Sequence, residues 1–201
     1  MNASWTLIWM PNWPEAVTAM AGLKRLLRFD AGFAQWFDRS PAGALRSFGL
    51  MIPALPLFLI LRFVDVALVP EVETFRLVAV TAINYALGWV MFPLILIVIG
   101  RAIGHEAQAV GTLACYNWFG FAFMAAASVL VLLDRTGILG SLMEFLTIPL
   151  LLASLLYEGF LLRVLMGVGY GGAALLVIID FTLTQSLYVL LMSPVLQSPA
   201  G

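Results

Sequence analysis

The stretch LVAVTAINYALGWVMFPLILIVIG, residues 77–100, is 24 residues long and contains no charged side chain. A helix needs about 20 mostly apolar residues to cross a hydrocarbon core of about 30 Å, because each residue adds about 1.5 Å. Residues 107–133 meet this test without a charge, 145–166 meet it with two charged residues, and 170–192 with one. The sequence therefore predicts at least four membrane-spanning helices.

A fifth span is expected at residues 48–69, although Arg62 and Asp65 interrupt it and only 15 uncharged residues separate Arg46 from Arg62. Arg62 and Asp65 are three residues apart, so they can pair on one helix flank, and Arg62 can also extend toward the headgroups. The alternative is four spans plus a re-entrant or surface-lying segment. The expected fold class is an all-α, polytopic transmembrane helical bundle, with residues 46–201 in the bundle and residues 1–45 in an N-terminal interfacial segment.

The composition excludes several classes of protein. Of the 201 residues, 63% are hydrophobic and 10% are charged, which is too apolar for a soluble domain of this size. The formal net charge of -1 argues against a nucleic-acid partner. One cysteine and one histidine provide neither a multi-cysteine metal site nor a Ser-His or Cys-His nucleophile with a plausible partner. We therefore expect no metal, no cofactor and no enzymatic activity.

The distribution of basic residues predicts the orientation, because Lys and Arg are enriched in cytoplasmic loops. With five spans, seven basic residues lie on the N-terminal side and three lie on the opposite side. The seven are Lys24, Arg25, Arg28, Arg39, Arg46, Arg101 and Arg163, and the three are Arg62, Arg76 and Arg135. This places the N-terminus in the cytoplasm and the C-terminus in the periplasm of a bacterial inner membrane.

The N-terminal segment predicts an amphipathic helix in the membrane interface. Trp5, Trp9 and Trp13 recur every four residues, and a periodic apolar pattern follows as far as Phe37. Basic residues lie between the apolar positions: Lys24, Arg25 and Arg28. Aromatic side chains favour the headgroup level, and basic side chains favour anionic lipid. The segment is expected to contact the bilayer, either as an anchor for the first span or as a recruitment helix.

Two carboxyl groups are expected inside the membrane. Asp180 lies ten residues into the last span and Glu158 lies eight residues before Met166, or about 15 Å and about 12 Å from the same face. They can therefore meet on consecutive antiparallel helices, and two carboxylates in a low dielectric cannot both ionise readily. The polar residues Asn84, Asn117 and Gln185 complete a candidate intramembrane cluster, which serves either a proton or cation relay or interhelical hydrogen bonding.

Two further patterns predict helix packing. Small residues recur every four positions along the third span, a spacing that favours close helix contact within the bundle or in a homodimer. They are Ala107, Gly111 and Cys115, followed by Ala122 and Ala126. Gly167, Gly169 and Gly172 match a dinucleotide-binding pattern, but they stand between two predicted spans and therefore predict a helical hairpin. His105 is expected in a solvated turn.

The chain resembles the bacterial members of the Yip1 family of polytopic membrane proteins after residue 40. The likeness rests on the aromatic lead Trp36-Phe37, on the turn from Arg101 to Glu106, and on Leu113-Ala-Cys-Tyr116. It implies five spans with the N-terminus inside, and it implies no catalytic residues. The first functional hypothesis is accordingly a non-enzymatic scaffold, membrane-organising or partner-binding role, with a homo-oligomer or a larger membrane complex left open. The alternative is a small proton- or cation-coupled transporter or channel subunit that uses Asp180 and Glu158.

Overall fold

A computed structural model of the chain describes residues 10–66 and 74–196. These residues form helices and no strand. Five helical segments within them are long and apolar enough to cross a membrane, which confirms the predicted bundle and makes the chain a multi-pass membrane protein. Four of them lie in the long helices α4 (Thr74–Ala102), α5 (Glu106–Arg135), α6 (Ser141–Met166) and α7 (Tyr170–Leu196). Each of these helices contains the span predicted for it.

The first membrane-spanning segment starts earlier than expected, at Pro41 in place of residue 48. It runs from Pro41 to Arg62 through α2 (Pro41–Ser47), the short 3-10 helix η3 (Phe48–Leu50) and most of α3 (Met51–Val66). The predicted positions 67–69 lie outside the described residues. The Ser40 side chain accepts a hydrogen bond from the Gly43 N–H and caps α2. The charge of Arg46 does not exclude this position from the helical segment, because Glu15 and Asp38 pair with its guanidinium at 3.2 and 2.5 Å.

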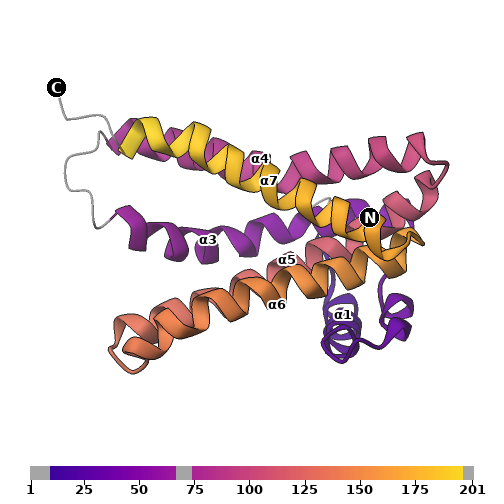
Figure 1. Cartoon of the computed structure of the whole chain (residues 1–201), viewed down its shortest axis with the longest axis horizontal. Helices are drawn as coiled ribbons and strands as arrows, with labels where there is room; N and C mark the ends of the chain where they lie inside the picture. Colours follow the sequence, from indigo (N-terminus) through magenta and orange to yellow (C-terminus); the bar gives the residue numbers. More distant parts are fainter. Residues whose placement is uncertain (1–9, 67–73, 197–201) are drawn as a thin grey trace, which may run out of the picture.

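The long helices run along the long axis of the molecule and separate toward the end at which α3 finishes (Figure 1). There α4 stays packed on α7 and α5 stays packed on α6, while α3 lies between these two pairs. Two polar contacts tie α3 to its neighbours: the Tyr85 hydroxyl of α4 donates to the Met51 carbonyl, and the Ser128 hydroxyl of α5 lies 3.2 Å from the Leu57 carbonyl.

The N-terminal segment folds back on itself and is not one continuous helix. Helix α1 (Trp13–Leu26) is followed by a turn and by the 3-10 helix η2 (Ala31–Trp36), which packs on α1. The turn contains Phe29 with a φ of 54°, a conformation that interrupts a helix. It is fixed by Asp30, whose carboxylate accepts from the Gly32 N–H at 2.8 Å and pairs with Arg25 at 2.7 Å. The apolar residues keep a helical spacing across this turn, so the sequence pattern did not reveal that the helix ends there.

The α1–η2 hairpin is docked on the bundle. Leu23, Leu26 and Phe33 are buried, and they belong to one core that continues into α4, α5 and α6. Phe29 stacks on Tyr157 of α6 with ring centroids 4.8 Å apart. Figure 1 shows α1 nearly end-on while the long helices cross the view, so its axis is transverse to theirs. This orientation lets α1 lie along a membrane surface when the long helices cross the membrane.

Candidate functional site

Glu158 of α6 and Asp180 of α7 meet inside the bundle, as their depths predicted. Each residue is 8% exposed, and their side chains interact where α6 packs on α7. The hairpin between α6 and α7 sets this register. Gly167 ends α6 in the left-handed conformation, with a φ of 67°, and α7 begins three residues later at Tyr170. The glycine-rich stretch thus forms the predicted helical hairpin.

Asp180 has a hydroxyl partner that the sequence did not predict. The Tyr116 hydroxyl of α5 donates to Asp180 Oδ2 at 2.6 Å. Phe92 of α4 packs against the Tyr116 ring with centroids 5.0 Å apart. Four helices therefore enclose the carboxyl pair. The similar depths of Tyr116 and Asp180 could have suggested this contact, but the sequence does not tell which face of α5 turns toward α7.

Two carboxyl groups that interact in a low dielectric do not both ionise readily, so we expect the pair to hold a proton. A hydrogen bond between two carboxyl groups exists only when one of them keeps its O–H. The Tyr116 hydroxyl donates to Asp180, which favours Asp180 as the acceptor and Glu158 as the group that carries the O–H. Among the described residues, Glu158 Oε1 is buried and has no hydrogen-bond partner. An unpaired buried acceptor costs about 1–3 kcal/mol, so this oxygen is suited to receive a proton, a water molecule or a cation.

Two of the remaining members of the predicted polar cluster, Asn117 and Gln185, do not join the carboxyl pair. The Asn117 amide donates to the buried Ser47 hydroxyl at 2.9 Å and thereby joins α5 to α2, apart from the carboxyl pair. Asn84 is buried on α4. Gln185 is exposed, as are Thr182 and Ser186. The cluster of five residues expected from sequence therefore divides, because one helical turn decides whether a side chain points into the bundle or away from it.

A second candidate surface is the outer face of α1. It is apolar although it is exposed: Trp13 is 80% exposed, and Val17, Met20 and Leu27 are also exposed. Lys24 lies in the same stripe. Apolar residues with interspersed cations are typical of helices that lie in the headgroup region. Trp5 and Trp9, the other two tryptophans of the predicted anchor, lie outside the described residues.

The remaining cations of the anchor divide between the two faces of α1. Arg28 is exposed, whereas Arg25 turns inward, pairs with Asp30 and stacks over the Trp36 ring at 5.3 Å. The Gly32 N–H and the Arg25 guanidinium hold the pKa of Asp30 below its ordinary value. Hydrogen bonds from the Ser40 hydroxyl and backbone, together with Arg46, likewise lower the pKa of Asp38. Both carboxylates therefore stabilise the docked hairpin in their ionised form.

The first part of the small-residue stripe of α5 packs against the segment before α2 and not against another membrane span. A side chain at Gly111 would meet the Arg39 carbonyl at 3.2 Å, so this glycine allows the segment before α2 to approach α5. Cys115 is fully buried and Ala122 packs partly against the core. Ala107 and Ala126 are exposed. The first part of the stripe thus serves packing within one chain.

His105 differs from its expected solvated position. Its Nδ1 lies 2.8 Å from the Met166 carbonyl, so it joins the turn between α4 and α5 to the end of α6. Arg101 and Glu106 close the same turn with an ion pair of 2.7 Å. The histidine is therefore part of the structure that aligns α5 with the α6–α7 hairpin, on which the carboxyl pair depends.

Among the described residues, no three His, Cys, Asp or Glu side chains lie close enough to hold a metal ion. The chemistry of the site is thus that of two carboxyl groups and a phenol. No protein-family model, curated protein or solved structure matches this chain, so its function has to be argued from these residues.

Proposed function

We propose that the protein is a small proton-coupled transport protein in which Glu158 and Asp180 form the proton-binding site. The observation that supports it is the contact between the two carboxyl groups, buried among four helices and bonded by Tyr116. Ionisable groups within a membrane are costly, and they commonly mark proton or ion pathways. A pair that shares one proton carries a single negative charge, and release of that proton leaves two, so the charge of the site follows its proton occupancy.

The arrangement of the helices suggests how protonation is linked to movement. Glu158 lies in the α5–α6 pair and Asp180 in the α4–α7 pair, which separate toward the end of the bundle at which α3 finishes. Loss of the shared proton leaves two negative charges in contact, and their repulsion favours separation of the two helix pairs. Protonation restores the hydrogen bond and favours closure.

Proton flux into liposomes tests this function. The purified protein is reconstituted with a pH-sensitive dye inside, and an outward potassium gradient with valinomycin sets a membrane potential that is negative inside. We expect proton entry with the natural protein and its loss with Glu158→Gln and with Asp180→Asn. Glu144→Gln is the matched control, since Glu144 is an exposed carboxylate at the start of α6. No flux above empty liposomes, or equal flux in all three variants, would contradict the proposal.

A membrane-organising or scaffold role is the second candidate, and the exposed apolar stripe of α1 favours it. In this role α1 lies in the cytoplasmic leaflet of a bacterial inner membrane and the bundle binds further copies or other membrane proteins, in line with the resemblance to the Yip1 family. Copurification of a defined membrane partner after mild detergent extraction, together with no proton flux, would favour this role over transport.

The orientation is tested separately. We propose that the N-terminus is cytoplasmic and the C-terminus periplasmic. A fusion of alkaline phosphatase to the C-terminus should be active in bacterial cells, whereas a green fluorescent protein fused there through the general secretion route should stay dark. The reverse pattern would overturn the orientation without affecting the proton-binding site.

A further inference from the structure

The turn of the α1–η2 hairpin holds an aromatic residue in a backbone conformation that suits glycine. Phe29 has a φ of 54°, which bulky residues rarely adopt, because the Cβ atom then lies too close to the following carbonyl oxygen. A glycine would form this turn without that strain. A strained backbone at a bulky residue points to a contact that its side chain makes.

The Phe29 ring contacts helix α6 beside Glu158. It stacks on the Tyr157 ring with centroids 4.8 Å apart, and it packs edge to face with the Phe160 ring at 5.3 Å. The buried Phe33 of η2 packs against the same Phe160 ring, with centroids 5.8 Å apart. The hairpin therefore contacts the residue directly before Glu158 and the residue two positions after it.

A hydrogen bond supports the aromatic contact. The Tyr157 hydroxyl donates to the Leu27 carbonyl at 3.2 Å. Leu27 caps the C-terminus of α1, where backbone carbonyls have no partner within the helix. Tyr157 thus joins α6 to the end of α1 by both its ring and its hydroxyl.

The hairpin and Asp180 lie on different sides of α6. Successive residues of a helix are about 100° apart around its axis, because a turn takes 3.6 residues. The direction midway between Tyr157 and Phe160 is therefore about 130° from that of Glu158, which interacts with Asp180 of α7. Helix α6 accordingly lies between the hairpin and α7. A rotation or shift of α6 toward the hairpin would withdraw Glu158 from Asp180.

We propose that Tyr157 is a positioning residue of the proton-binding site and that the docked hairpin holds it through Phe29. The aromatic contacts support the side of α6 that is turned away from α7, and they thereby keep Glu158 against Asp180. The inference rests on the proton-binding site proposed above and gives the N-terminal segment a role beyond membrane anchoring. Without this support the two carboxyl groups would meet less often, since the contacts with α5 and α7 alone would then set the position of α6.

Disulfide cross-linking measures the position of Glu158 without relying on proton transport. The full chain carries Glu158→Cys and Asp180→Cys in a Cys115→Ala background, and copper phenanthroline starts oxidation in liposomes. A maleimide–polyethylene glycol gel shift after denaturation counts the remaining thiols. We expect Phe29→Leu and Tyr157→Leu each to slow cross-linking at least about threefold, in line with the strength of an aromatic pair.

Two substitutions at the turn separate positioning from folding of the turn itself. Phe29→Gly removes the backbone strain and favours the turn, but it also removes the ring. If the ring positions α6, Phe29→Gly slows cross-linking as Phe29→Leu does. If Phe29 served the turn alone, Phe29→Gly would leave the rate unchanged or raise it. Phe29→Tyr keeps the ring and should retain the parent rate.

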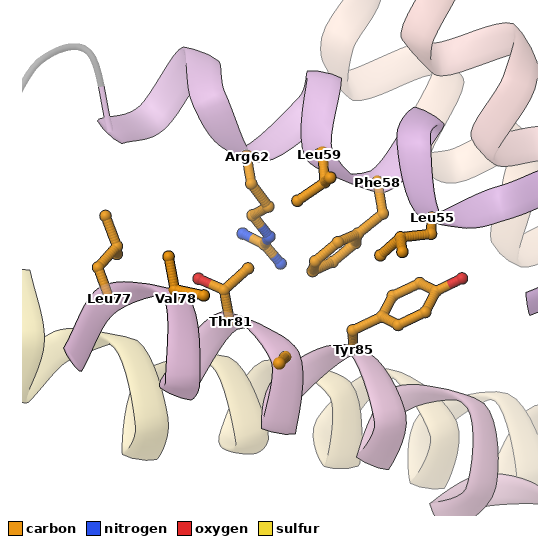
Figure 2. A pocket seen from close by; sticks show the side chains of 9 residues that line it. Leu55, Phe58, Leu59, Arg62, Leu77, Val78, Thr81 and Tyr85 are labelled. Carbon is orange, nitrogen blue, oxygen red and sulfur yellow. The ribbon is translucent and has the colours of Figure 1, made fainter. Parts of the chain in front are cut away.

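Two controls lie away from the hairpin. Phe75→Leu makes the same exchange at an exposed ring near the start of α4. Ala82→Phe places a ring in a groove of about 220 Å³ between α3 and α4, which Figure 2 shows with Leu55 and Phe58 on one side and Tyr85 on the other. The described residues that line this groove come from α3 and α4 alone, so neither control should change the cross-linking rate.

Equal cross-linking in the parent chain, Phe29→Leu and Tyr157→Leu would overturn the positioning role. An equal loss of rate in Ala82→Phe would also overturn it, because it would show a general loosening of the bundle. Proton flux separates this inference from the proposed function. If Phe29→Leu slows cross-linking but the natural protein has no flux, transport is refuted and the positioning of Glu158 stands. If the natural protein has flux and cross-linking is unaffected, transport stands and the positioning role is refuted.

Discussion

The Tyr116 hydroxyl donates to Asp180 Oδ2 at 2.6 Å, and this contact joins α5 to α7 across the centre of the bundle. It supplies one of the hydrogen bonds that a buried carboxyl group needs. Because Asp180 accepts from Tyr116, it is suited to be the acceptor toward Glu158 as well. In the proposed site the phenol thus favours Glu158 as the carboxyl group that keeps the shared proton.

Replacement of Tyr116 by phenylalanine should therefore weaken the bundle. Tyr116→Phe keeps the ring contact with Phe92 but removes the donor, so we expect the free energy of unfolding to fall by about 1–2 kcal/mol. The measurement is reversible unfolding in mixed detergent, followed by circular dichroism. Tyr170→Phe is the control, because Tyr170 is exposed at the start of α7. Equal stability of the two variants would show that the hydrogen bond contributes nothing.

Asn117 and Gln185 should differ in their effect on stability, although the sequence grouped them together. Asn117→Leu removes the 2.9 Å hydrogen bond to Ser47 from a buried position and should cost about 0.6–1.7 kcal/mol. Gln185→Leu changes an exposed side chain and should alter the stability by less than about 0.5 kcal/mol. The same unfolding assay compares them. A larger loss from Gln185→Leu would mean that this residue packs against a partner or a second copy.

Docking of the α1–η2 hairpin should depend on pH. The folded state lowers the pKa of both Asp30 and Asp38 below 3.8, so their stabilising contribution is present above that value. It is lost as the pH falls through the lower values of the folded state. The protection of backbone amides in residues 10–40, relative to the intrinsic exchange rate at each pH, should therefore fall below about pH 4. The protection of α5 and α6 should be retained.

A substitution tests the source of this pH dependence. Asp38→Asn removes one of the two carboxylates and its ion pair with Arg46, so the hairpin should exchange faster at neutral pH and respond less to acid. Asp134→Asn, near the end of α5, should leave the exchange of residues 10–40 as it is in the natural protein. An unchanged acid response in Asp38→Asn would indicate that other groups control the docking.

The exposed stripe of α1 should contact lipid. A polarity-sensitive label at Met20→Cys, in a Cys115→Ala background, should shift to shorter wavelength on reconstitution and be quenched by brominated lipid. The same label at Thr18→Cys lies on α1 about 160° around the helix from Met20, and it should report water. Similar spectra at both positions would contradict an interfacial orientation of α1.

A structural feature of this fold could be predicted only where it leaves a pattern in the sequence. Long uncharged runs fixed the four later spans to within a few residues, because the bilayer thickness imposes their length. The start at Pro41 could not be predicted, since Arg46 appeared to exclude the position and its partners Glu15 and Asp38 lie in another element. Ion pairs between distant residues leave no periodic pattern.

The sequence predicted how deep the candidate-site residues lie in the membrane, but not the direction in which their side chains point. Equal distances from one membrane face correctly brought Glu158 and Asp180 together. The same argument wrongly placed Asn117 beside them, because residues at one depth can face any side of a helix. The contact of Tyr116 depends on the rotation of α5, which the packing against α2, α3 and α6 determines.

The claim most central to this account is that the carboxyl pair holds a shared proton, and infrared difference spectroscopy of the protein in liposomes measures it directly. At neutral pH we predict a protonated-carboxyl stretch that shifts to lower frequency in D₂O and disappears in Glu158→Gln, because the remaining carboxylate of Asp180 then accepts from Tyr116 and from the new amide. Absence of that band in the natural protein, or its persistence in Glu158→Gln, would contradict the account.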